Sequence, residues 1–157
     1  MRYRSAAVAL ACAASLLTRY GPARALRIRD EAGRPLATIA IPATFTLSFM
    51  HSVNLSRVDE EFSVGEDGSL TLERVLYDQM STGMPSGDED GFAVVDGRFE
   101  TRPGRRFDEI AVRISPVPGH ELRENGRRRP LTYWAPIESM LRFSAARESD
   151  LPKEIDR

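Results

Sequence analysis

Two histidines, one glutamate and one serine are the residues of this 157-residue sequence with the clearest capacity for chemistry. His51 and His120 are its only histidines, and each belongs to a segment that alternates apolar and polar residues. Alternation with a period of two is typical of strands with one buried face. An imidazole beside a carboxylate can bind a ligand, share a proton or fix a strand pairing, so the position of these side chains matters.

The stretch from Phe45 to Val64 predicts a β-hairpin that positions the first histidine. A four-residue loop at 54–57 would set His51 directly opposite Glu60, with both side chains directed into the core. A slip of one residue would turn an apolar row toward solvent, which disfavours that shift. We therefore predict an imidazole and a carboxylate within hydrogen-bonding reach, and we expect Ser52 on the opposite face.

Several interpretations of this pair stay open. A buried His51–Glu60 pair could be purely structural, because such hydrogen bonds also fix strand register in ordinary cores. The same two residues, with His120 and Ser52, could instead form the polar part of a small-ligand pocket, with the corner at 83–85 on its rim. Two histidines and a glutamate could also hold a metal ion, although no short ligand spacing supports this. Nucleophilic catalysis by Ser52 is disfavoured, since neighbours on a strand point to opposite faces.

The elements around these residues predict a single all-β domain. About ten short segments with strand patterns are separated by turn residues, which is typical of an antiparallel β-sandwich or barrel. The strongest hairpin signals are Asp96-Gly97 and Asn125-Gly126. We expect Leu131–Tyr133 to be the strand that returns from the second hairpin, and the segment 137–147 to hold a last strand or a helix. Arg74 interrupts an apolar row, which a β-bulge near Glu73 would resolve.

Two charged loops have a functional and a plain interpretation. The acidic cluster at 88–90 offers oxygen ligands for calcium but lacks the spacing of a dedicated calcium loop, so a solvated tip is favoured. Three arginines at 102–106 could contact an anion, although charged turns usually stay in water.

The first 25 residues have the layout of a secretory signal peptide. A short basic opening precedes an apolar run of small residues, and Ala23-Arg24-Ala25 supplies the small residues that a signal peptidase accepts. We expect cleavage after Ala25, with an uncleaved membrane anchor as the alternative. The expected units are a signal at 1–25, a β domain at 26–147 and a polar tail at 148–157. The predicted location is the periplasm or another extracytoplasmic space.

Cleavage would change the charge and the cysteine content. Residues 1–25 contain four arginines and no acidic residue, so the remaining chain has 18 basic and 23 acidic residues and a formal net charge of −5. That charge argues against general binding to nucleic acid. The single cysteine, Cys12, would leave with the signal, so we expect no disulfide in the domain.

The sequence resembles the bacterial family called domain of unknown function 1850. The resemblance rests on His51-Ser52-Val53, on Val58 and the Glu60-x-Phe62 pattern, on the corner at 83–85, and on His120-x-Leu122. It implies a small exported or membrane-anchored protein encoded beside TRAP-type transporters of the TAXI class. The partners it suggests are the transporter's membrane subunits or its solute-binding protein.

Taken together, these observations predict a non-catalytic periplasmic accessory or binding protein associated with TRAP-type solute uptake. The alternative is a small-ligand or metal-binding β protein that uses the layer of His51 and Glu60. A hydrolase is less well supported, because no nucleophile elbow, phosphate loop or dinucleotide motif is present. The sequence identifies no cofactor.

Overall fold

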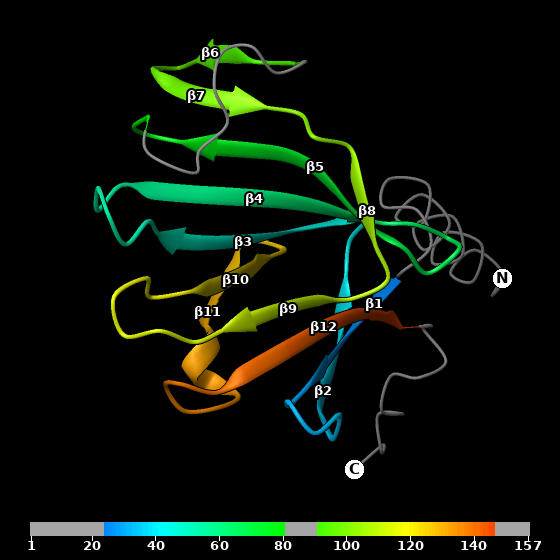
Figure 1. Cartoon of the computed structure of the whole chain (residues 1–157). Helices are drawn as coiled ribbons and strands as arrows, with labels where there is room; N and C mark the ends of the chain where they lie inside the picture. Colours follow the sequence, from blue (N-terminus) through cyan, green and yellow to red (C-terminus); the bar gives the residue numbers. More distant parts are fainter. Residues whose placement is uncertain (1–23, 81–90, 147–157) are drawn as a thin grey trace, which may run out of the picture.

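The computed structural model describes residues 24–80 and 91–146, which form two antiparallel sheets (Figure 1). The smaller sheet has the strand order β2-β1-β12-β9, and the larger has the order β11-β10-β3-β4-β5-β7-β6, with β8 paired to β5. The all-β class and the antiparallel arrangement are confirmed. The strands are β1 (Arg24–Arg29), β2 (Pro35–Ile41), β3 (Thr44–Met50), β4 (Arg57–Val64), β5 (Leu70–Tyr77), β6 (Ala93–Val95), β7 (Arg98–Thr101), β8 (Arg105–Phe107), β9 (Ile110–Arg113), β10 (Glu121–Glu124), β11 (Arg127–Pro130) and β12 (Met140–Ala146).

One apolar core joins the two sheets. The smaller sheet contributes side chains such as Leu26 and Phe143, which are fully buried. The larger sheet contributes a stacked pair, Phe45 and Phe62, whose ring centroids are 5.3 Å apart. These residues come from alternate positions of their strands, so the period of two in the sequence reports the buried face correctly. Burial of this face supplies most of the favourable free energy of folding.

Both predicted two-residue hairpins are confirmed. Asp96 and Gly97 join β6 to β7, and Asn125 and Gly126 join β10 to β11. All four residues have positive φ angles, which is the backbone of the turn type whose twist matches paired strands. The prediction of a returning strand at Leu131–Tyr133 is wrong. The strand that returns from the second hairpin is β11, and Leu131–Tyr133 forms a 3-10 turn (η1). The last described segment is a strand, β12, which confirms the predicted strand and not the alternative helix.

The predicted register of the central hairpin is wrong. In the structure Phe45 pairs with Phe62 and Phe49 pairs with Val58, a shift of four residues from the expected pairing. A shift by an even number keeps every apolar side chain on the same face, so alternation alone cannot exclude it. The loop therefore extends from 51 to 56, and Glu60 lies opposite Leu47 instead of a histidine.

The predicted β-bulge is present in β5. Glu61 pairs with Arg74 while Phe62 pairs with Leu72, so Glu73 is the extra residue. Each residue after the bulge points to the opposite face from the one expected for an uninterrupted strand, because the additional residue shifts the alternation by one position. Val75 and Tyr77 consequently point into the core, and Leu76 is only partly buried on the other face.

The expected signal boundary falls inside the first strand. Ala25 is fully buried and pairs with Ala40 on one side and Ala146 on the other. A protease needs an accessible, unpaired substrate backbone, so cleavage after Ala25 would have to precede the pairing of β1. Among the described residues there is no helix of the length and apolarity needed to cross a bilayer. Residues 1–23 and the expected tail at 148–157 lie outside the described part.

Two deletions in β5 should have opposite consequences. Deleting Glu73 removes the extra residue and leaves every neighbour facing its present side, so we expect the fold to persist with a loss of at most about 2 kcal/mol. Deleting Leu76 instead forces Tyr77 off the core face, and the expected cost is about 3–5 kcal/mol, as for truncating a buried aromatic residue. Urea unfolding of both variants measures the difference. Equal losses would show that the bulge does not absorb the phase change.

Candidate functional site

His51 organises the loop between β3 and β4. Its backbone N–H donates to the carbonyl of Ser56 (2.8 Å), and its carbonyl accepts from Leu55 N–H (2.9 Å). Its ring Nδ1 faces the N–H of Val53 at 3.4 Å, a long and weak hydrogen bond. The histidine is half-buried, and these contacts assign it a role in shaping the loop from 51 to 56.

This loop presents apolar side chains to solvent. Val53 is 73% exposed and Leu55 is 64% exposed. Leu55 has a φ angle of 51°, a left-handed backbone that costs a residue with a side chain about 1–2 kcal/mol. Asn54 helps to hold this conformation, because its Oδ1 accepts a hydrogen bond from the hydroxyl of Ser56 (2.9 Å). Ser52 is exposed in the same loop and is not part of a strand, so the predicted placement of its side chain on the outer face of a strand is wrong.

Glu60 lies on the core-facing side of β4, as predicted, but without the predicted partner. Its cross-strand neighbours are Leu47 and Val75, and it is half-buried. No described residue forms a hydrogen bond or an ion pair with its carboxylate. Burial raises the pKa of Glu60 above its ordinary value, because the apolar surroundings disfavour the charged form.

His120 is placed on the same face of the larger sheet. It precedes β10, and its ring lies against Phe49, with centroids 5.4 Å apart. Its Nδ1 is buried without a hydrogen-bond partner among the described residues. Burial lowers the pKa of His120 below its ordinary value, so the neutral imidazole is favoured.

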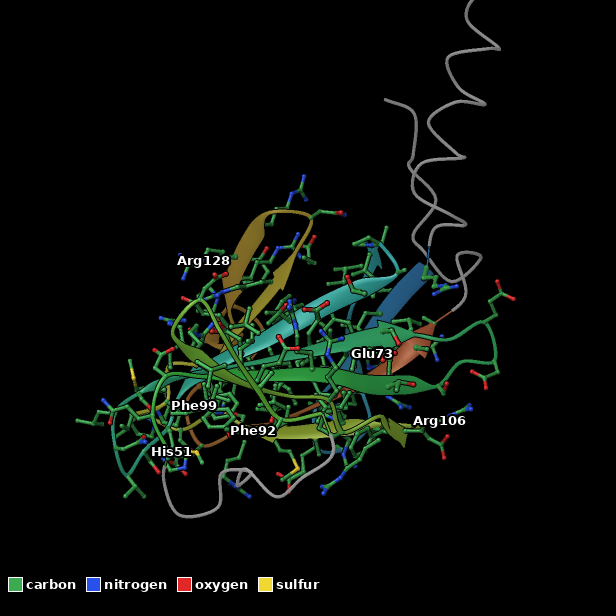
Figure 2. All side chains as sticks on the ribbon, turned by 90° about the horizontal axis from the view of Figure 1, so that it is seen from above. His51, Glu73, Phe92, Phe99, Arg106 and Arg128 are labelled. Carbon is green, nitrogen blue, oxygen red and sulfur yellow. The ribbon has the colours of Figure 1, made fainter. Side chains whose placement is uncertain are left out.

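The structure therefore does not assemble the predicted polar layer. Glu60 is opposite Leu47 on β3, whereas His51 lies four residues beyond Leu47, in the loop that follows the end of β3, so the two residues are not cross-strand partners. Figure 2 shows His51 at one end of the sandwich, away from Glu73 and Arg106 at the other end. In the described part of the chain no three His, Cys, Asp or Glu side chains are close enough to share a metal ion. The prediction of an imidazole–carboxylate pair is wrong.

Sequence reasoning missed the most connected carboxylate of the larger sheet. Asp59 lies on its outer face and accepts hydrogen bonds from Ser48 on β3 (2.5 Å) and Arg98 on β7 (2.7 Å). Arg123 of β10 is a third partner at 3.3 Å. Burial alone would raise the pKa of Asp59, but these hydrogen bonds and the two guanidinium charges outweigh it, and the pKa lies below the ordinary value. Ser48 and Asp59 both occupy outward positions of their strands, but only the observed register places them opposite each other.

Two further predicted features have different outcomes. The corner at 83–85 and the acidic cluster at 88–90 lie outside the described residues. Of the three turn arginines, Arg102 pairs with Glu100 (2.6 Å) and Arg106 pairs with Asp67. These two cations are engaged in ion pairs within the chain.

Replacing Glu60 by glutamine should stabilise the protein as the pH rises. Because the pKa of Glu60 is raised, the folded state favours the protonated form, and stability is lost as the pH rises from the unfolded value of 4.5 through the raised value. Glu60→Gln removes this loss, so its urea midpoint should exceed that of the unmodified protein at pH 7 and the difference should shrink at pH 4. Glu61→Gln is the matched control: Glu61 faces outward and binds Arg74 (2.6 Å), so no gain at pH 7 is expected. A midpoint difference for Glu60→Gln that does not vary with pH would contradict the assignment.

Loss of the Asp59 carboxylate should be costly. Asp59→Asn removes the anion that Arg98 and Arg123 share, at a site where the Asp59 side chain is only 12% exposed, although Arg98 keeps Asp78 and Arg123 keeps Glu121. We expect a loss of about 2 kcal/mol in urea unfolding, as for charge-assisted hydrogen bonds. Asp67→Asn breaks the exposed pair with Arg106, and its expected loss is below about 1 kcal/mol. Similar losses for the two variants would show that the Asp59 cluster contributes no more to the free energy of unfolding than an exposed ion pair.

Comparison with known proteins identifies the family. No curated protein and no solved structure matches the chain. The family described as domain of unknown function (DUF1850) matches residues 45–131, which make up more than half of the sequence. The match begins at Phe45 on β3 and includes the loop built by His51, the Asp59 cluster and His120. The chain therefore belongs to the DUF1850 family.

Proposed function

We propose that this protein is a non-catalytic, exported accessory protein that docks on a protein component of a TRAP-type uptake system. The observation that carries the proposal is the loop from 51 to 56, which contains the family-like His51-Ser52-Val53 and exposes two large apolar side chains. The association with TAXI-class transporters comes from the family resemblance. The export comes from the signal-like layout of residues 1–25.

Exposed apolar side chains from neighbouring segments gather around this loop. Met50 N–H donates to the carbonyl of Pro118 (2.7 Å), which brings the β9–β10 connection and its exposed Val117 to the end of β3. Asn54 reaches the carbonyl of Gln79 (3.5 Å), next to the exposed Met80. The β9–β10 connection and the end of β5 lie at the same end of the sandwich as the loop from 51 to 56 (Figure 1). We call this end, with Val53, Leu55, Met80 and Val117, the apolar loop end.

Gathering is what distinguishes these side chains from ordinary surface residues. Single exposed apolar residues are common on soluble proteins and need no explanation, whereas a group of them marks an interaction surface. Hydrogen bonds within the loop, such as that from the hydroxyl of Ser56 to Asn54, also hold its conformation. This conformation includes the left-handed backbone of Leu55. A preorganised loop loses little conformational entropy on binding, which favours a specific protein contact.

Co-purification tests the proposal. The tagged domain is incubated with detergent-solubilised membrane subunits of a TAXI-class TRAP system, and separately with the solute-binding protein of that system. We expect retention of one of them by the unmodified domain. Val53→Asp should abolish this retention, because it places a charge at the centre of the apolar contact.

Leu55→Asn provides the matched variant for the loop. Asparagine tolerates the left-handed backbone, so the loop conformation and the stability should be kept while the apolar side chain is lost. We expect its retention of the partner to fall about tenfold or more, in keeping with the loss of a buried interface anchor. Retention of neither component by the unmodified domain, or undiminished retention by both variants, would refute docking by the apolar loop end.

A further inference from the structure

A second candidate site lies on the smaller sheet. The β1–β2 turn and the segment that follows η1 enclose an open pocket of about 460 Å³, a size in the usual range for small-ligand sites. The two segments lie side by side below the sheet in Figure 1. All lining residues fall outside the family-matched range 45–131, so this pocket is independent of the apolar loop end.

One wall of the pocket is apolar. Trp134, the only tryptophan of the chain, lines the pocket together with Leu36 and Met140. Trp134 is held by the turn of η1, where its N–H donates to the carbonyl of Leu131 (3.1 Å), and Leu131 is fully buried. The side chain of Trp134 packs against the apolar core, is partly exposed, and lines the pocket. A flat aromatic face of this kind packs well against a hydrocarbon group and attracts a cation.

The polar groups of the pocket are mostly anionic. Asp30 is already bound by Arg34, through the side chain (2.7 Å) and the backbone N–H (2.9 Å). Glu31 and Glu138 are exposed, and the side-chain carboxylate of neither residue forms a hydrogen bond or an ion pair with a described residue. The lining thus combines three carboxylates with a single guanidinium, and two of the carboxylates remain available to a ligand.

Glu138 has a fixed position on the rim. Its backbone N–H donates to the carbonyl of Ile114 (2.7 Å), and its own carbonyl accepts from Arg113 Nη1 (2.9 Å). Its φ angle is 72°, a conformation that glutamate rarely adopts. These contacts hold the backbone of Glu138 at the edge of the pocket that Trp134 also lines.

We propose that this pocket binds an organic ammonium ion that carries an apolar group. The apolar part lies against Trp134, Leu36 and Met140, and the ammonium group lies between the indole and the carboxylates of Glu31 and Glu138. An anion of the same shape is repelled by the two carboxylates, and a neutral analogue loses the attraction to both the ring and the acidic groups.

Tryptophan fluorescence tests the proposal directly, because the only indole of the chain lines the pocket. The domain is titrated into the millimolar range with 2-phenylethylammonium, 2-phenylethanol and 3-phenylpropionate, which differ mainly in charge. We expect a saturable change with the ammonium ion, an affinity about tenfold weaker for the alcohol, and no saturation with the carboxylate. Added sodium chloride should weaken the first of these only.

Matched variants separate the pocket from general charge effects. Glu31→Gln combined with Glu138→Gln should reduce the preference for the ammonium ion over the alcohol from about tenfold to about twofold, with an unchanged melting temperature because both side chains are exposed. Asp96→Asn removes one exposed carboxylate from the distant β6–β7 turn and should change nothing. Equal binding of all three probes, no fluorescence change with any of them, or an unaltered preference in the double variant would each overturn the proposal. None of these outcomes depends on whether the apolar loop end binds a transporter component.

Discussion

The carboxylate of Asp59 is the contact on which the arrangement of the larger sheet depends. It joins β4 to β3 through Ser48, to β7 through Arg98 and to β10 through Arg123. Because Ser48 stands directly opposite Asp59, their hydrogen bond is compatible with the observed register and not with a pairing shifted by four residues. The same register determines the length of the loop from 51 to 56 and leaves Glu60 among apolar neighbours. The charged cluster on the outer face is thus tied, through the register, to the environment of Glu60 in the core and to the length of the loop.

The two proposed binding regions occupy different parts of the sandwich. The apolar loop end belongs to the larger sheet and to the family-matched range, so docking there would be a property shared with the family. The pocket beside Trp134 belongs to the smaller sheet and lies outside that range. An accessory protein with both would contact a partner at one end and a small cation elsewhere.

Much of the fold was predictable because it depends on neighbours in sequence. Asp96-Gly97 and Asn125-Gly126 formed the expected turns, since their residues accept positive φ angles locally. The bulge at Glu73 was predictable because Arg74 interrupted an apolar row. The site was predicted poorly. His51 and Glu60 were placed together from alternation alone, which is unchanged by a shift of four residues.

The sequence by itself determined the all-β class, the buried faces of most strands and the family. These follow from local turn preferences and from the separation of apolar and polar side chains, which act within a few residues. Only the tertiary structure decided the register of β3 and β4, the isolation of Glu60 and the pocket beside Trp134. Each of these requires contacts between segments far apart in the chain, such as Arg123 with Asp59 or the β1–β2 turn with the segment after η1. Alternation within a strand carries no information about which distant partner completes the contact.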